Sequence, residues 1–138
     1  MPQRDEVRTP LFDRLVDLDP APEKEGRPRR TLDRAGLHDS VPRELARLVH
    51  SPVDAEVPES VEGTVLASGI PDFAPLAAKS GPDRTRLERT IERAIAAFEP
   101  RLTDIRVGLR PSPDGERGVI GVIEANVRIE GVVEPVSF

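Results

Sequence analysis

The chain has 138 residues and a formal net charge of −5, which suits one domain with a real core and argues against nucleic acid as its main partner. It contains no cysteine, so disulfides, thiolate metal sites and cysteine nucleophiles are excluded. No apolar run approaches the roughly 20 residues of a membrane helix, and the N-terminus lacks a signal-peptide core. We therefore expect a soluble protein that does not insert into a membrane, and the absence of cysteine is compatible with a reducing cytoplasm.

The chain opens with a short predicted helix. Thr9 and Pro10 supply an N-cap and a first helical residue, and apolar side chains follow at helical spacing, namely Leu11, Phe12, Leu15, Val16 and Leu18. An isolated helix of this length is marginal in water. It must therefore dock, either on its own domain or on a neighbouring subunit.

Residues 21–36 are rich in charge, contain two prolines and two glycines, and show little periodicity, so we interpret them as a mobile linker. Five basic against three acidic side chains are a weak excess, which favours a solvated linker over a site for phosphate or an acidic surface. The predicted division is an N-terminal helix and mobile linker at 1–36 and a folded domain at 37–138.

A second helix is predicted from Ser40, as N-cap, to the residues before Ser51, and its apolar face carries Val41, Leu45, Leu48 and Val49. A third, shorter helix over residues 60–68 would end at Gly69 in the left-handed conformation. After it we expect a structural turn in which Phe73 anchors the loop to the core. Its residues are Gly69, Pro71, Asp72 and Phe73.

The longest predicted helix ends at about Phe98, and its apolar face is formed by Leu87, Ile91, Ala94, Ile95 and Phe98. Its charged residues read as a solvated face of mixed sign. Pro100 stops this helix, which fixes Glu99 and Arg101 at a rigid corner between helix and strand. Two explanations stay open for this corner: ordinary exposed charges, or a docking point. Glu99 faces the negative end of the helix dipole, so a cation should answer it, either Arg101 or a partner's.

Three strands are predicted after the corner, at 105–109, 118–129 and 132–138. Pro135 inside the last one indicates an edge strand. The expected fold class is α+β, with N-terminal helices and one long amphipathic helix packed on a small antiparallel β-meander. An exposed edge would invite pairing with another chain by strand addition.

The sequence contains no convincing pattern of catalytic or metal-binding residues. His38 and His50 match no ligand spacing, so a surface or capping role is favoured over a metal site, and no cofactor or metal is expected. Glu99 with Glu124 or Glu134 would be the carboxylate pair of a glycoside hydrolase. The chain has neither Trp nor Tyr to form a sugar platform, so we assign no catalytic residue and expect no enzyme.

Several short motifs in fixed order carry a resemblance that covers nearly the whole chain. They lie at 10–15, 41–48, 66–73, 98–102, 123–125 and 134–136. In this arrangement the chain resembles the GPW family of contractile-tail baseplate wedge proteins, sometimes labelled lysozyme-like, and within it the baseplate subunits of type VI secretion. The family's Glu-Pro-Arg motif matches Glu99, Pro100 and Arg101.

The resemblance implies a structural role in a large hetero-oligomeric baseplate. The implied partners are other wedge subunits, met through Glu99, Pro100 and Arg101, and the contractile sheath, which the protein would link to the baseplate. On this basis Glu99→Ala or Arg101→Ala should weaken wedge assembly while leaving the fold near wild-type stability. Two alternatives stay open: a murein-cleaving, lysozyme-like hydrolase, and a small adaptor or regulator on the same fold.

Overall fold

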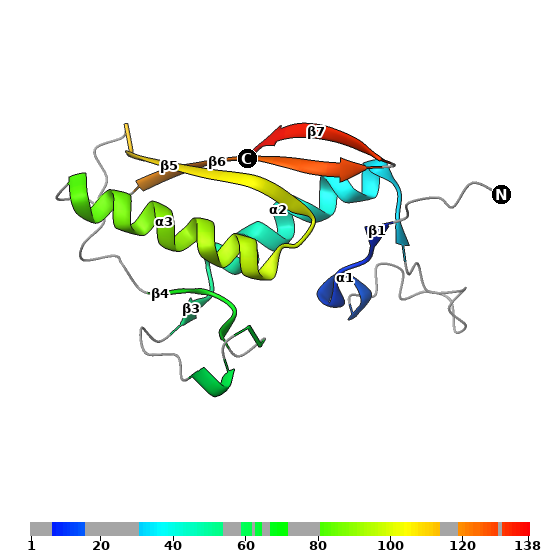
Figure 1. Ribbon diagram of the computed structural model, residues 1–138, viewed down its shortest axis with the longest axis horizontal. Coiled ribbons are helices and arrows are strands. Elements are labelled where there is room, and N and C mark those ends of the chain that lie inside the picture. The colour runs from blue at the N-terminus through cyan, green and yellow to red at the C-terminus, as the bar shows by residue number, and fades with distance from the viewer. Residues whose placement is uncertain are drawn as a thin grey trace.

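A computed structural model describes residues 7–15, 31–53, 59–61, 63–64, 67–71, 81–113, 119–129 and 131–138. A three-stranded antiparallel sheet forms one layer, with strand order β5-β6-β7, and helices α2 and α3 form a second layer on one of its faces (Figure 1). The core lies between the two layers and draws its buried apolar side chains from both. The expected α+β class is confirmed.

Helix α2 (Arg34–Val49) begins earlier than the sequence suggested. Its N-cap is Asp33, whose carboxylate accepts a 2.8 Å hydrogen bond from the backbone N–H of Gly36. Ser40, the expected cap, lies inside the helix and is fully buried. A cap at Asp33 satisfies an otherwise unpaired N–H group and lets Leu37 enter the core, one turn before Val41. The linker prediction is therefore wrong for 31–36, while residues 21–30 lie outside the described part of the chain.

Helix α3 (Gly81–Phe98) ends where predicted and buries Leu87, Ile91 and Ile95. Two of its charged residues do not belong to a purely solvated face. The carboxylates of Glu92 and Glu88 accept hydrogen bonds from the backbone N–H groups of Val107 (3.0 Å) and Leu109 (2.9 Å). These N–H groups lie on the outer edge of strand β5 (Leu102–Pro111). Helix α3 therefore supplies hydrogen-bond acceptors to this edge of the sheet and also covers one face of the sheet.

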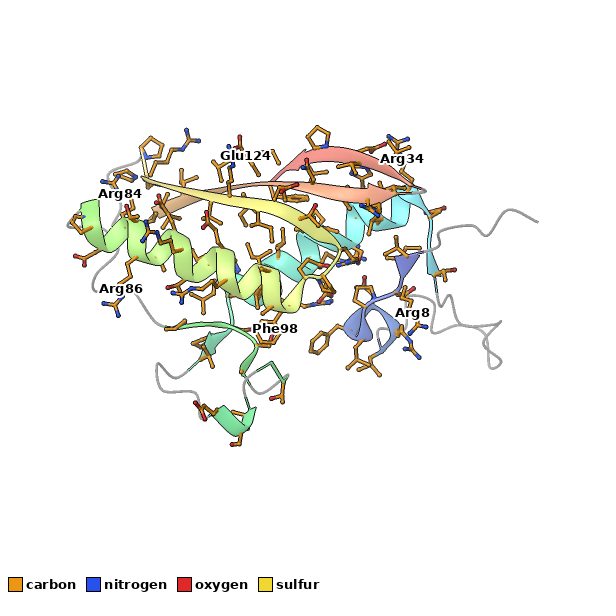
Figure 2. All side chains as sticks on the ribbon, in the orientation of Figure 1. Arg8, Arg34, Arg84, Arg86, Phe98 and Glu124 are labelled. Carbon is orange, nitrogen blue, oxygen red and sulfur yellow. The ribbon has the colours of Figure 1, made fainter. Side chains whose placement is uncertain are left out.

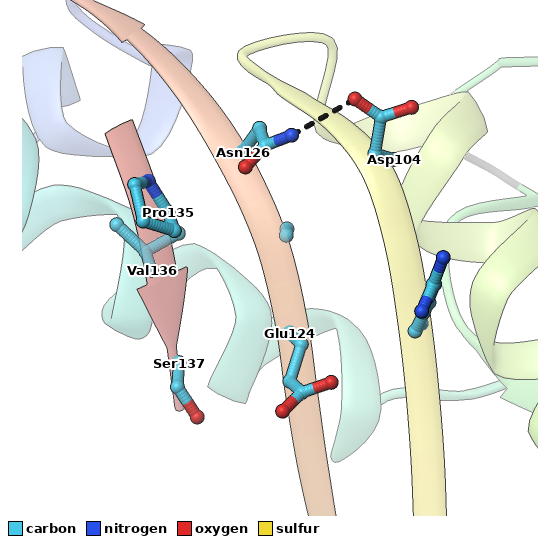
Figure 3. Close-up of a pocket in the computed structure, with 8 residues that line it drawn as sticks. Asp104, Glu124, Asn126, Pro135, Val136 and Ser137 are labelled. Carbon is cyan, nitrogen blue, oxygen red and sulfur yellow. Dashed lines mark hydrogen bonds between the residues drawn. The ribbon is translucent and has the colours of Figure 1, made fainter. Parts of the chain in front are cut away.

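A β-bulge interrupts the pairing of β5 with β6 (Val119–Ile129) between Thr103 and Arg106. One extra residue on β5 changes the alternation of its side chains, so Leu102 and Val107 are both buried. Asp104 sits in the bulge with a φ of +51°, and its carboxylate accepts a 2.9 Å hydrogen bond from the amide of Asn126 (Figure 3). The bulge explains why simple alternation predicted only the later part of this strand.

Strand β7 (Val132–Ser137) is an edge strand, as Pro135 predicted. A short turn containing Gly131, with a φ of +80°, connects it to β6. Beyond β7, Phe138 and Ile123 exchange two backbone hydrogen bonds of 2.9 and 3.0 Å. Hydrogen-bonded and non-hydrogen-bonded pairs alternate along an antiparallel ladder, so the nitrogen of Pro135 faces away from β6. The missing N–H of this proline therefore costs no hydrogen bond to β6.

Strands β3 (Pro52–Val53) and β4 (Ile70–Pro71) form a short parallel pair. The helix expected over 60–68 is wrong for the described residues there, which contain a 3₁₀ turn, η1 (Glu59–Val61). Gly69 does not adopt the expected left-handed helical conformation. It has a φ of +155°, and a Cβ there would lie 2.3 Å from the carbonyl oxygen of Ser51, so glycine lets β4 approach β3. Pro71 lies in β4, whereas Asp72 and Phe73 fall outside the described residues.

The N-terminal segment packs beside α2. Strand β1 (Val7–Arg8) pairs with β2 (Thr31–Leu32), and helix α1 (Leu11–Leu15) follows β1 (Figure 1). The predicted continuation of α1 to Leu18 lies outside the described residues. Among the helices that the structure describes, none is long and apolar enough to cross a membrane.

Candidate functional site

The corner after α3 holds a buried ion pair. The Nε of Arg101 donates a 2.5 Å hydrogen bond to Oε1 of Glu99, and its Nη2 donates to Oε2. The two side chains are only 11% and 5% exposed, so they are not ordinary surface charges, and that interpretation is wrong. Arg101 supplies the cation that the helix C-terminus requires. Burial makes this bidentate pair stronger than an exposed one, provided that both partners are present.

The backbone fixes this pair at a tight turn. The N–H of Glu99 donates to the carbonyl of Ile95 (2.8 Å), as the last helical bond of α3, and the N–H of Leu102 donates to the carbonyl of Glu99 (3.1 Å). Pro100 occupies the second position of the resulting four-residue turn, where its fixed φ is favourable. Pro100 itself is exposed. The turn thus directs the charged side chains of Glu99 and Arg101 inward and leaves Pro100 on the surface.

A chain of hydrogen bonds links the corner to the N-terminus. Nη1 of Arg101 donates to Oγ of Ser40 (2.9 Å), and this hydroxyl donates to Oδ2 of Asp13 in α1 (2.6 Å). Arg101 lies in the turn between α3 and β5, Ser40 in α2 and Asp13 in α1, so the network joins segments far apart in sequence. Among the described residues, no buried side-chain nitrogen or oxygen lacks a partner. This full pairing makes the corner rigid.

Asp13 is held by two arginines as well as by Ser40. Nη2 of Arg43 lies 3.2 Å from its Oδ2, and Nη1 of Arg47 lies 3.6 Å from its Oδ1. Burial raises the pKa of the Asp13 carboxyl, but the hydrogen bonds from Ser40 and Arg43 and the charges of both arginines outweigh it, so the net pKa is lowered. The Arg47 guanidinium also stacks over the ring of Phe12, 5.3 Å from its centroid.

A cavity of about 340 Å³ opens beside the corner, between α1, α2 and the end of α3. Phe12 and Phe98 give it aromatic walls, Leu48 an apolar floor, and Glu44, Arg47 and Glu99 polar edges. Ser51 and Ser68 complete its lining. The sequence did not indicate this cavity, because its walls come together only through tertiary packing.

The carboxylates proposed for glycoside cleavage are not assembled into a pair. Both oxygens of Glu99 are occupied by Arg101. Glu134 forms an ion pair with Arg34 in α2 and lies 3.8 Å from Nε2 of His38. Glu124 projects from the opposite face of the sheet, away from the helices, as Figures 2 and 3 show. The geometry therefore supports a structural site at Glu99 and gives no support to hydrolysis.

The other residues considered from sequence have structural partners. His50 forms the C-cap of α2, and its Nδ1 lies 2.7 Å from the carbonyl oxygen of Ala46, so a capping role is confirmed. On the outer face of the sheet, an open cavity of about 390 Å³ lies between Asp104, Glu124 and Ser137 (Figure 3). Within the described residues no cluster of three or more side chains could hold a metal ion.

The comparisons with protein families and with solved structures both give matches. Residues 35–132 match the family described as Baseplate wedge protein gp25. The matched range covers nearly all of α2, all of α3 and most of the sheet. Among solved structures, a chain of "The baseplate complex from the type VI secretion system" is similar over 74% of this chain and 90% of that one, with a TM-score of 0.54 and 15% identity, which shows a shared fold. Curated proteins give no match. Because the family match spans well over half of the chain, this protein belongs to the GPW (gp25) family of baseplate wedge proteins.

Proposed function

We propose that the chain is the wedge subunit of a type VI secretion baseplate, of the kind called TssE, acting in the bacterial cytoplasm within a large hetero-oligomeric assembly. The observation that carries this proposal is the family match over residues 35–132. The fold shared with a chain from a type VI baseplate supports the choice of a secretion machine among contractile injectors.

Within that assembly, the corner is proposed as the contact with neighbouring wedge subunits. Glu99 and Arg101 already neutralise one another inside the chain, so a partner is not needed to balance them. Their role is to hold the turn, and the exposed Pro100 is the part that a partner can touch. A preformed turn loses little conformational entropy on binding, which favours affinity.

The second proposed contact is with the contractile sheath, through strand β7. The outer edge of β5 is closed by Glu88 and Glu92, whereas no described strand pairs with the outer edge of β7. A strand from a sheath protein would therefore add beside β7. Pro135 limits the bonds it can form there, because the middle of the edge offers an acceptor but no donor.

The pairing of Glu99 and Arg101 changes how this proposal must be tested. Removal of either side chain leaves a buried charge alone, so the expectation that Glu99→Ala or Arg101→Ala preserves stability no longer follows. Pro100→Glu is a better probe, because position 100 is exposed and both members of the ion pair are kept. Pro113→Glu is its matched control, at an exposed proline in the turn after β5.

The experiment is a pull-down of the tagged full-length chain from its native cells, with mass spectrometry of the bound proteins. We expect baseplate and sheath proteins with the wild type and with Pro113→Glu, and a clear loss of wedge proteins with Pro100→Glu. Urea unfolding of all three proteins must give equal midpoints. Recovery of a single soluble partner without baseplate proteins would contradict the proposal and favour an adaptor. Glycan cleavage by the purified chain that is lost in Glu99→Gln would favour a hydrolase.

A further inference from the structure

Helix α1 docks in the opposite sense to an ordinary amphipathic helix. Its acidic residue faces inward, since the Asp13 side chain is 9% exposed and binds α2. Its apolar residues remain exposed: Leu11 is 59% exposed and Leu15 70%, and Phe12 is 46% exposed at the rim of the cavity, where Arg47 covers one face of its ring. None of its residues is buried. A helix attached only for internal stability would bury these side chains, because burial of a leucine contributes roughly 1.5 to 3 kcal/mol.

The helix is nevertheless held in place by contacts before it and within it. Before it, β1 pairs with β2, and Val7 and Leu32 pack against the core. Within it, Asp13 binds Ser40, Arg43 and Arg47. The three apolar side chains are therefore presented on a rigid support, which is the arrangement of a preorganised binding element.

The surroundings of these side chains are basic. Arg8 and Arg14 are exposed, and among the described residues neither forms an ion pair (Figure 2 shows Arg8 next to α1). Arg43 is half exposed at the neighbouring surface of α2. The one carboxylate of the helix, Asp13, is turned inward and neutralised. An apolar cluster edged by unpaired arginines is complementary to an apolar groove edged by carboxylates.

We propose that Leu11, Phe12 and Leu15 form an anchor that inserts into an apolar, acid-edged groove on another protein subunit. This surface is distinct from the corner and from β7, and it lies outside residues 35–132, which the family match covers. The anchor stands on the hydrogen-bond network of the corner, because Ser40 binds both Asp13 and Arg101. The anchor is therefore connected through Ser40 to the residues that hold the turn.

The test places a photo-reactive amino acid at position 15 of the full-length chain in native cells, with position 133 as control, since Val133 is also an exposed apolar residue. We expect cross-links from position 15, and not from 133, to an apolar peptide of another protein that contains Asp or Glu. Arg8→Glu with Arg14→Glu should reduce these cross-links, and exchange of the mapped carboxylates for lysine should restore them.

A second variant gives the magnitude. Leu11→Ser with Leu15→Ser should weaken binding of the purified cross-linked partner by about tenfold or more, because each leucine loses a buried contact. Cross-links confined to the same chain, cross-links equal to those of the control, or binding to anionic lipid vesicles that depends on these leucines would each overturn the proposal. Failure of the baseplate assignment would appear separately, as loss of wedge proteins from the wild-type pull-down.

Discussion

Helices α1 and α3 are attached to the same domain by opposite kinds of contact. Helix α3 buries Leu87, Ile91 and Ile95 and turns most of its charges outward. Helix α1 turns Asp13 inward and leaves Leu11 and Leu15 in water. Apolar burial is nearly independent of pH and salt, whereas attachment through charges depends on both. The comparison therefore separates the part of the molecule that sets its stability from the part that binding partners and solution conditions can move.

The largest expected effect breaks the apolar attachment of α3. Ile95 is fully buried, so Ile95→Ala should lower the free energy of unfolding by about 2 to 5 kcal/mol. Urea unfolding followed by circular dichroism measures this change, and Arg89→Ala, on the exposed side of the same helix, is the control. A loss below that of the control would mean that α3 does not organise the core.

The corner should follow as the second largest effect. Arg101→Ala leaves Glu99 buried without its cation and should cost about 3 kcal/mol in the free energy of unfolding. Arg101→Lys keeps the charge but loses the two-pronged contact, so it should fall between the alanine variant and the wild type. Equal midpoints for all three proteins in urea would show that the ion pair does not brace the turn.

A smaller effect should appear when the polar attachment of α1 is broken by acid. The folded-state pKa of Asp13 is lowered from its ordinary value of 3.8, so its contribution is complete above that value and is lost as the pH falls through the lowered pKa. Amide hydrogen exchange of residues 11–15 should accelerate there. Asp13→Asn should accelerate it already at pH 7, with a local loss of about 1 kcal/mol, and Asp39→Asn should have no effect.

The smallest expected effect sharpens the comparison. Leu15→Ser changes a side chain that is already in water, so the free energy of unfolding should change by less than about 0.5 kcal/mol. Thermal and urea unfolding check this directly. A loss of several times that size would show that Leu15 packs against its own domain, which would contradict the outward orientation of α1.

The sequence predicted the elements whose signals are local and repeated. The spacing of Leu87, Ile91 and Ile95 specified α3, Pro100 specified its end, and the alternation of β6 together with Pro135 specified the meander and its edge. The sequence also located the charged corner. It left open whether Arg101 or a partner supplies the cation that pairs with Glu99, and the structure shows that Arg101 does. In these cases the local pattern and the tertiary contact select the same structure.

What was missed depends on distant partners. Ser40 has the chemistry of an N-cap, but its hydroxyl is used by Arg101 and Asp13, which lie 61 and 27 residues away. Glu88 and Glu92 looked solvated because the N–H groups they bind belong to β5. The two-residue strands β1 to β4 have too few residues to show a period. A cap signal at Asp33, three residues before Gly36, was present and passed over.

The closed edge of β5 determines how many sheet partners one molecule can have. Because Glu88 and Glu92 occupy one edge, the β7 edge is the one at which the sheet of described strands can be extended. Two copies that joined through their β7 strands would leave only closed edges outside, so the growth of such a sheet stops at a pair. This arrangement would keep free subunits from polymerising into fibres and would still allow the proposed strand from another protein to pair with β7.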